Sequence, residues 1–134
     1  MVKFLLDTNI CIAWLKGESR IRERLATLSP ESVGISVINL AELFFGAYNS
    51  ERVEHNLGRL FEFSSELNVV NLDMAGVKRY GELKTALRKQ GNVIDEFDLL
   101  IASICLTHNF TLVTNNEKHF ARIEGLKLEN WLHS

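Results

Sequence analysis

The sequence predicts an α/β domain in which a parallel sheet is covered by helices on both faces. Short apolar runs, typical of buried strands, alternate with longer segments whose apolar residues recur every three or four positions, typical of helices. Strands that alternate with helices are joined by crossover connections, which build a parallel sheet. At 134 residues the chain is long enough to bury a continuous core, and we assign residues 1–134 to a single domain.

Turn residues mark the boundaries of several predicted elements. Gly17 and Gly91 follow helical segments, at positions where glycine often ends a helix. Pro30, the only proline, lies in a turn before a short strand. The expected strands cover residues 3–6, 33–36, 68–72, 111–114 and, at an edge, 127–132. The expected helices cover residues 10–16, 19–28, 37–48, 52–66, 75–90 and 97–108.

The composition is that of a soluble globular protein, with 46% hydrophobic and 24% charged residues. A net charge of −2 gives no global argument for nucleic-acid binding, which must rest on local basic patches. No apolar run approaches the roughly 20 residues that a membrane-spanning helix needs, and the N-terminal apolar run is too short for a signal peptide, so we expect a cytoplasmic protein. Cys11 and Cys105 lie in apolar helical segments, and we expect buried, reduced thiols.

An acidic residue follows the first strand directly. Asp7 is the first residue of the stretch Asp7-Thr8-Asn9, and the carboxyl ends of strands in α/β sheets open into the crevice where ligands bind. A carboxylate at that position invites a metal ion or a phosphate group. The alternative is that Asp7, Thr8 or Asn9 simply caps the following helix, because all three side chains are good N-caps.

Two further acids occur on helical faces that otherwise look apolar. Glu42 shares its face with Ile38, Ala41 and Phe45, and Asp98 lines up with Ile101. Burying an unpaired carboxylate is costly, so Glu42 needs a partner, either a cation or an arginine in a buried salt bridge. Asp98 has the alternative of capping its helix.

A divalent cation would explain all three acids together. Carboxylates brought close to one another repel, and a positive ion compensates for that repulsion. Oxygen ligands suit Mg²⁺ or Mn²⁺ rather than Zn²⁺, and the sequence has no cysteine or histidine pair at zinc-binding spacing. The four histidines are scattered, and we interpret them as surface or structural residues: His55, His108, His119 and His133.

In motif order and spacing the whole chain resembles the PIN-domain ribonucleases, and more closely the VapC toxins of bacterial type II toxin–antitoxin systems. The residues that carry the resemblance are Asp7-Thr8-Asn9, Glu42, Asp98-Leu99-Leu100-Ile101-Ala102, Leu112-Val113-Thr114-Asn115-Asn116 and the final stretch from Gly125 to Trp131. The resemblance implies a three-layer α/β/α fold with a central parallel sheet, and a Mg²⁺- or Mn²⁺-dependent endoribonuclease. It places Asp7, Glu42 and Asp98 at the metal-binding positions.

The resemblance also implies roles for residues after the fourth strand. Thr114 and Asn116 would orient water or the metal's surroundings and count with the catalytic set. The family often has a fourth acid where this chain has Asn116, and an amide oxygen is a weaker ligand for a hard cation. Occupancy of a second metal position therefore stays open. Glu117 or Asp95 could supply the missing charge, or both could be exposed loop acids.

The same resemblance implies the reaction and its partners. Hydrolysis by water leaves 3′-OH and 5′-phosphate ends, and the RNA is structured, with tRNA as the expected class. Relatives act as homodimers, and a VapB-type antitoxin blocks the acidic pocket. We expect the dimer and antitoxin surfaces among apolar residues that one small core does not need, although these could also belong to the core: Trp14, Leu15, Phe44, Phe45, Tyr48 and Phe61.

RNA binding also requires cations. One candidate patch consists of Arg20, Arg22 and Arg24; the other consists of Lys84, Arg88 and Lys89. Each of these residues has the alternative of a solvated helical face.

Two other functions compete with a nuclease. An aspartate after the first strand is also the nucleophile of haloacid-dehalogenase-type phosphatases, but that motif wants a second aspartate where this chain has Asn9. The non-enzymatic alternative is a weak or inactive PIN domain that only binds its antitoxin or RNA, and Asn116 favours it.

Overall fold

The computed structural model describes residues 1–132 and contains a five-stranded sheet whose strand pairs are all parallel. His133 lies outside the described residues. The strand order is β3-β2-β1-β4-β5. The strands are β1 (Phe4–Leu6), β2 (Val33–Ser36), β3 (Asn68–Val70), β4 (Thr111–Val113) and β5 (Lys127–Glu129). The predicted parallel sheet is thus confirmed, although three of the strands end earlier than expected.

The helices agree with the predicted ones to within a few residues at each end. They are α1 (Thr8–Leu15), α2 (Ser19–Ala26), α3 (Val37–Tyr48), α4 (Val53–Ser65), α5 (Met74–Lys89), α6 (Glu96–His108) and α7 (Glu117–Phe120), with a 3₁₀ turn at Pro30–Ser32. Within residues 1–132, none of the helices combines the length and apolar character required to span a bilayer.

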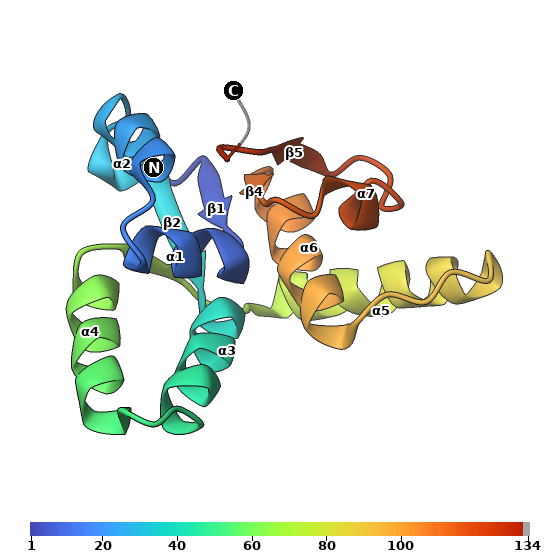
Figure 1. The fold of residues 1–134 in the computed structure, drawn as a ribbon. Helices are drawn as coiled ribbons and strands as arrows, with labels where there is room; N and C mark the ends of the chain where they lie inside the picture. Colours follow the sequence, from blue (N-terminus) through green and yellow to red (C-terminus); the bar gives the residue numbers. More distant parts are fainter. Residues whose placement is uncertain (133–134) are drawn as a thin grey trace.

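The two faces of the sheet pack into two separate cores, which gives the expected three-layer α/β/α arrangement. Adjacent residues of a strand point to opposite faces, so Leu6 enters the core formed with α1–α4, whereas Leu5 enters the core formed with α5–α7. Val113 and Leu112 on β4 divide in the same way. Figure 1 shows α3 and α4 on one side of the molecule and the long helix α5 extending away on the other. Cys11 and Cys105 are buried, free thiols, as expected.

The predicted inner face of α3 is wrong by one position. Phe45, expected inside, is 71% exposed, and the buried residues of the helix are Asn39, Leu43 and Ala47. Apolar residues surround this helix on most sides, so their spacing alone does not select the face that the sheet covers. Glu42 is therefore at the border of the buried face and half-buried, instead of lying among apolar neighbours.

Candidate metal centre

Asp7 directly follows β1, the middle strand of the sheet, and precedes α1. Its backbone N–H donates to the Val113 carbonyl at 2.9 Å, which continues the pairing with β4, and its side chain is only 6% exposed. One carboxylate oxygen, Oδ1, accepts from the backbone N–H of Thr8 at 2.9 Å and caps α1. The other oxygen, Oδ2, accepts from the Thr114 hydroxyl at 2.9 Å. Asp7 thus caps its helix and also faces the residue that follows β4.

Glu42 reaches the same place from α3. Its Oε1 accepts a hydrogen bond of 2.7 Å from the hydroxyl of Thr8, the residue next to Asp7. Among the described residues, no lysine or arginine forms an ion pair with Glu42, so the salt bridge considered from the sequence is not observed. Thr8 is consequently not the cap of α1, because Asp7 takes that role.

Asp98 lies in the first turn of α6 without capping it. The N-cap is Asp95, whose Oδ2 accepts from the Phe97 N–H at 3.1 Å. The Asp98 Oδ2 atom instead lies 2.9 Å from Nε2 of His119, which comes from the short helix α7. Asp98 therefore points across to the segment that follows β4, the same segment that provides Thr114.

His119 is a site residue that the sequence did not single out. Its Nε2 atom is buried next to Asp98, yet its geometry leaves it without a hydrogen-bond partner, because 2.9 Å is a close contact in which the ring N–H is not aligned on the carboxylate. On the other side of the ring, Nδ1 lies 2.7 Å from Nη2 of Arg122. The arginine can only donate, so Nδ1 accepts and the proton of a neutral ring is on Nε2. Nothing but proximity to Asn116 could have identified this histidine in the sequence.

Negative charge on neighbouring carboxylates raises the pKa of Glu42 and of Asp98, which indicates that both acids lie near Asp7. Burial raises the pKa of Asp7, and hydrogen bonds from Thr114 and Thr8 only partly oppose that effect. Burial likewise raises the pKa of Glu42, and repulsion from Asp7 and Asp98 raises it further. The pKa of Asp98 is raised by burial and then by the negative charge of Asp7. Repulsion of this kind acts only between nearby charges.

The chemical type of these side chains suits a hard divalent cation, which prefers oxygen ligands. Three carboxylates supply oxygen ligands of this kind, and burial raises the pKa of each of them. In residues 1–132, however, no three acidic, histidine or cysteine side chains are already arranged around one ion position. An ion bound by all three acids would therefore require some of their side chains to rotate.

The remaining predicted site residues lie at different distances from this centre. Thr114 is fully buried and bonds to Asp7. Asn116 takes part through its backbone N–H, which donates to Thr114 Oγ1 at 3.0 Å, while the residue itself is exposed. Asp95 is close enough to raise the pKa values of Glu42 and Asp98, so it adds negative charge to the site. Glu117 is exposed at the start of α7.

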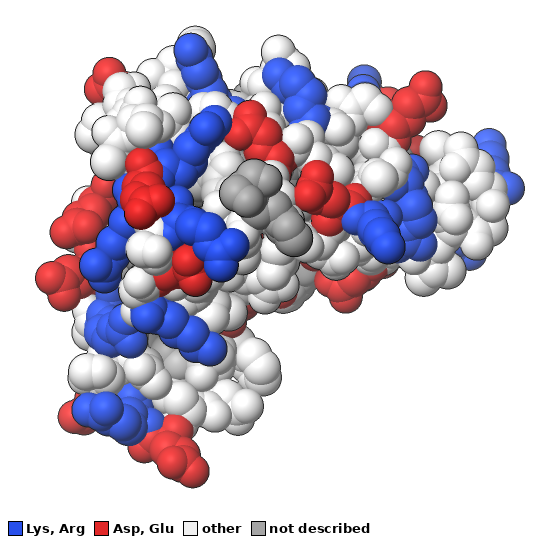
Figure 2. All heavy atoms as spheres, turned by 45° about the horizontal axis from the view of Figure 1, so that its top comes forward, with Lys and Arg blue, Asp and Glu red and all other residues white. Residues whose placement is uncertain are grey.

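The two predicted RNA-binding patches lie on different parts of the molecule, α2 and α5 (Figure 1). Arg20 contacts Glu18 and the Leu132 carbonyl, and Arg24 pairs with Glu129 at 3.2 Å. Both arginines therefore hold α2 against neighbouring structure. Figure 2 shows basic side chains gathered over the part of the molecule that carries α2, with acidic side chains between them.

The α5 patch is paired in part. Lys84 forms an ion pair with Glu96, whereas Arg88 and Lys89 are exposed in the last turn of α5, as Arg22 is on α2. The described part of the chain shows no ion pair for these three exposed residues.

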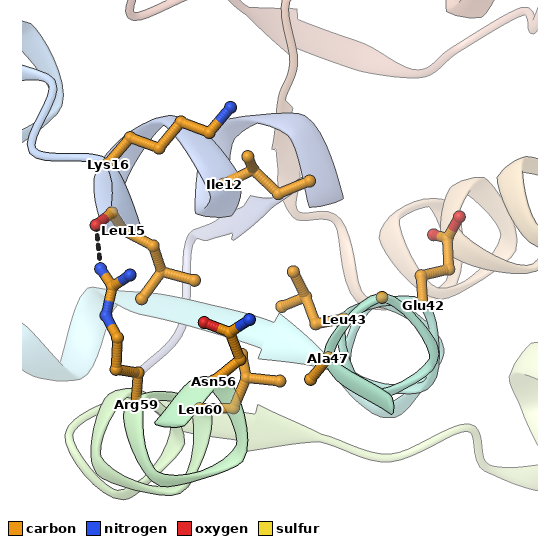
Figure 3. A pocket seen from close by; sticks show the side chains of 10 residues that line it. Ile12, Leu15, Lys16, Glu42, Leu43, Ala47, Asn56, Arg59 and Leu60 are labelled. Carbon is orange, nitrogen blue, oxygen red and sulfur yellow. Dashed lines mark hydrogen bonds between the residues drawn. The ribbon is translucent and has the colours of Figure 1, made fainter. Parts of the chain in front are cut away.

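An apolar groove runs between α1, α3 and α4 and ends near Glu42. It has a volume of about 340 Å³, and its apolar lining includes Ile12, Leu15, Leu43, Ala47 and Leu60. Figure 3 shows Leu43 and Ala47 pointing into the space between α3 and α4, with Glu42 on the side of α3 turned away from α4.

The apolar residues expected at partner surfaces divide into two groups. Phe45, Tyr48 and Phe61 are 71%, 64% and 60% exposed. Trp14, Leu15 and Phe44 are instead half-buried and pack against the core beneath α1–α4. The second group therefore contributes mainly to the core.

A family model described as "PIN domain" matches residues 4–126 of this chain. The chain is 37% identical over 132 residues to the tRNA(fMet)-specific endonuclease VapC of Shigella flexneri, a match that covers 98% of this chain and 99% of the relative. It is 42% identical over 130 residues to the ribonuclease VapC2 of Rickettsia felis, covering 96% and 97% of the two chains.

A solved structure agrees with these sequence matches. The crystal structure of VapBC2 from Rickettsia felis bound to a DNA fragment from their promoter contains a chain that superposes on this one with a TM-score of 0.91. That chain is 41% identical to this one, and the match covers 98% of this chain and 99% of the other.

Proposed function

This chain belongs to the PIN-domain family and, within it, to the VapC toxins, and from that premise we propose that it is a divalent-metal-dependent endoribonuclease whose centre is Asp7, Glu42 and Asp98. The observation that carries the proposal is the convergence of these three carboxylates: Thr8, next to Asp7, donates its hydroxyl hydrogen to Glu42, and the charge of Asp7 acts on both Glu42 and Asp98. They come from the residue after β1, from α3 and from α6, and none of the described lysines or arginines forms an ion pair with any of them. A cation of the Mg²⁺ or Mn²⁺ type is the partner that such a set lacks.

Each acid has a neighbour that holds it in place. Two donors, the Thr8 N–H and the Thr114 hydroxyl, fix the Asp7 carboxylate, and the Thr8 hydroxyl fixes one oxygen of Glu42. His119 lies against Asp98. A divalent cation held by the three acids would lower the pKa of a water molecule and offset the charge of a phosphodiester.

We propose water as the nucleophile, as the family resemblance implies, so that hydrolysis leaves a 3′-OH and a 5′-phosphate. This mechanism needs no acid–base histidine pair, and none of the described histidines faces another across this centre. The Thr114 hydroxyl and the Asn116 backbone lie at the edge of the centre, where they would orient the incoming water or phosphate.

Structured RNA, and tRNA in particular, is the proposed substrate class. The support is the Shigella flexneri relative, which is specific for tRNA(fMet) and is 37% identical over almost the full length. Exposed cations near the two ends of the molecule, Arg22, Arg88 and Lys89, would contact the RNA backbone. Such a substrate places the activity in the cytoplasm.

A VapB-type antitoxin is the proposed partner, because the solved Rickettsia felis relative is a VapBC assembly. The apolar groove between α1, α3 and α4 has a lining that suits an apolar helix face, and it ends close to Glu42. We also propose a homodimer, for which Phe45, Tyr48 and Phe61 offer exposed apolar area.

A cleavage assay on purified protein tests the nuclease directly. A transcribed tRNA and its anticodon stem–loop are incubated with the wild type after EDTA treatment, then with Mn²⁺ or Mg²⁺ restored. We expect cleavage only with the added ion, 5′-phosphate ends on the products, and loss of cleavage in Glu42→Gln. Glu82→Gln, which alters an exposed acid of α5, is the matched control and should cleave normally.

The same assay separates the enzyme from a binding module. Asn116 supplies no carboxylate, and this favours a weak or inactive domain that binds RNA or antitoxin alone. RNA that is bound but left intact under every ion would establish that second function.

A further inference from the structure

Asn39 is a fully buried polar residue one turn before Glu42 on α3, and the reaction proposed above gives it no role. Its Oδ1 atom accepts from the Ser36 hydroxyl at 2.6 Å and from the Ser36 backbone N–H at 3.3 Å. These contacts form a capping box at the start of α3, because the Asn39 N–H also donates to Ser36 Oγ at 3.1 Å. They fix which end of the amide is oxygen, so the Nδ2 group must face the other way.

The Nδ2 group faces Thr8. It donates to the Thr8 hydroxyl oxygen at 3.1 Å, a contact between α3 and the first residue of α1. A hydroxyl has one hydrogen, and an ionised carboxylate can only accept. Because Asn39 occupies the Thr8 oxygen as an acceptor, the Thr8 hydrogen is directed to Glu42 Oε1, 2.7 Å away. The donor and the acceptor of both hydrogen bonds are therefore fixed: Asn39 donates to Thr8, and Thr8 donates to Glu42.

We propose that Ser36, Asn39 and Thr8 form a relay that positions the Glu42 carboxylate beside Asp7 for a divalent cation. The relay starts at Ser36, the cap of α3, passes through Thr8, the first residue of α1, and returns to α3 at Glu42, three residues after Asn39. It rests on the proposed function, since it presumes that Glu42 holds the ion. Thr8 and Asn39 are positioning residues, because they act through Glu42.

Two physical effects support this assignment. Glutamate is a long side chain with considerable rotamer freedom, and half-burial alone leaves Glu42 free to turn outward. The Thr8 hydrogen bond removes that freedom, and because the Thr8 backbone N–H also binds the Asp7 carboxylate, the same residue holds both acids. Partners that orient ligands in this way are worth about 10–100-fold in metal affinity.

Mn²⁺ binding by calorimetry tests the relay on the full chain. Thr8→Val keeps the shape of the side chain and removes its hydroxyl, whereas Thr8→Ser keeps the hydroxyl. Thr107→Val is the matched control, because the Thr107 hydroxyl donates to the Ser103 carbonyl within α6 and has no contact with the site. Melting temperatures of all variants establish that each is folded at the temperature of the titration.

We expect Mn²⁺ to bind about 10–100-fold more weakly to Thr8→Val, and with wild-type affinity to Thr8→Ser and Thr107→Val. Asn39→Leu should weaken binding as well. The double variant Thr8→Val/Asn39→Leu should be no weaker than the weaker single variant, since both act through one hydrogen-bonded unit.

The outcomes separate the relay from the function on which it rests. A wild-type chain that takes up no Mn²⁺ contradicts the metal-dependent nuclease and the relay together. Wild-type affinity in Thr8→Val, or losses that add in the double variant, overturn the relay and leave the proposed function standing.

Discussion

Replacing Asp7 by asparagine should stabilise the protein at neutral pH while it abolishes RNA cleavage. Asparagine remains a good N-cap for α1, so the helix start is kept. Burying an ionised carboxylate costs several kcal/mol. The two hydrogen bonds that Asp7 accepts contribute about 1.5–3 kcal/mol each and nearly offset this cost. The raised pKa of Asp7 shows that the cost is the larger quantity. We therefore expect Asp7→Asn to have a higher free energy of unfolding and a higher melting temperature than the wild type.

The sign of the pH dependence is a second part of this prediction. A carboxyl group whose folded-state pKa is raised contributes stability below its unfolded pKa of about 3.9, and this contribution is lost as the pH rises through the folded pKa. The advantage of Asp7→Asn over the wild type should therefore be full at pH 7.5 and shrink as the pH falls towards 3.5. Urea unfolding of both proteins over this pH series measures it.

Asp73 is the matched control, since it is an N-cap aspartate on α5 whose Oδ1 accepts from the Gly76 N–H at 2.9 Å. That hydrogen bond lowers the pKa of Asp73, so its charge stabilises the folded protein above the unfolded pKa. Asp73→Asn should therefore lose stability at pH 7.5. If Asp7→Asn were also destabilised at pH 7.5, Asp7 would be an ordinary helix cap and the reasoning about the acidic centre would be refuted.

Three further predictions concern other parts of the molecule. Arg24→Ala should lower stability by about 1 kcal/mol, through loss of the exposed Glu129 pair and of the stacking 5.6 Å above Trp131, with no change in the rate of RNA cleavage; a large drop in cleavage would show that Arg24 binds RNA. Phe45→Ser should leave the free energy of unfolding within about 0.5 kcal/mol of wild type and weaken self-association in sedimentation analysis, because the side chain is 71% exposed; an unchanged dimer would remove Phe45 from the interface. His119→Ala should weaken Mn²⁺ binding about tenfold by freeing Asp98, and calorimetry would contradict this if the affinity were unchanged.

The positions of the acids could be predicted because they depend on topology. A parallel sheet brings the carboxyl ends of its strands to one edge, so Asp7 after β1 and Thr114 after β4 become neighbours once the strands are recognised. The bounds of α3 were also predictable, since Ser36 caps it and its apolar character ends at Tyr48.

Side-chain partners could not be predicted in the same way. The inner face of α3 was misassigned because its apolar residues surround the helix, and the sheet rather than the periodicity selects Asn39 and Leu43. His119 gave no signal, because a lone histidine in a turn carries no spacing to interpret, and its contact with Asp98 bridges 21 positions of the chain. The groove beside Glu42 likewise depends on how α1, α3 and α4 pack.

The central claim is that Asp7, Glu42 and Asp98 share one divalent cation. Crystals grown with Mn²⁺ and measured for anomalous scattering test it most directly. We predict an anomalous peak within coordination distance of oxygens from all three carboxylates, and loss of that peak in Asp98→Asn. A peak bound elsewhere, or three carboxylates that keep separate partners with no ion between them, would contradict the account.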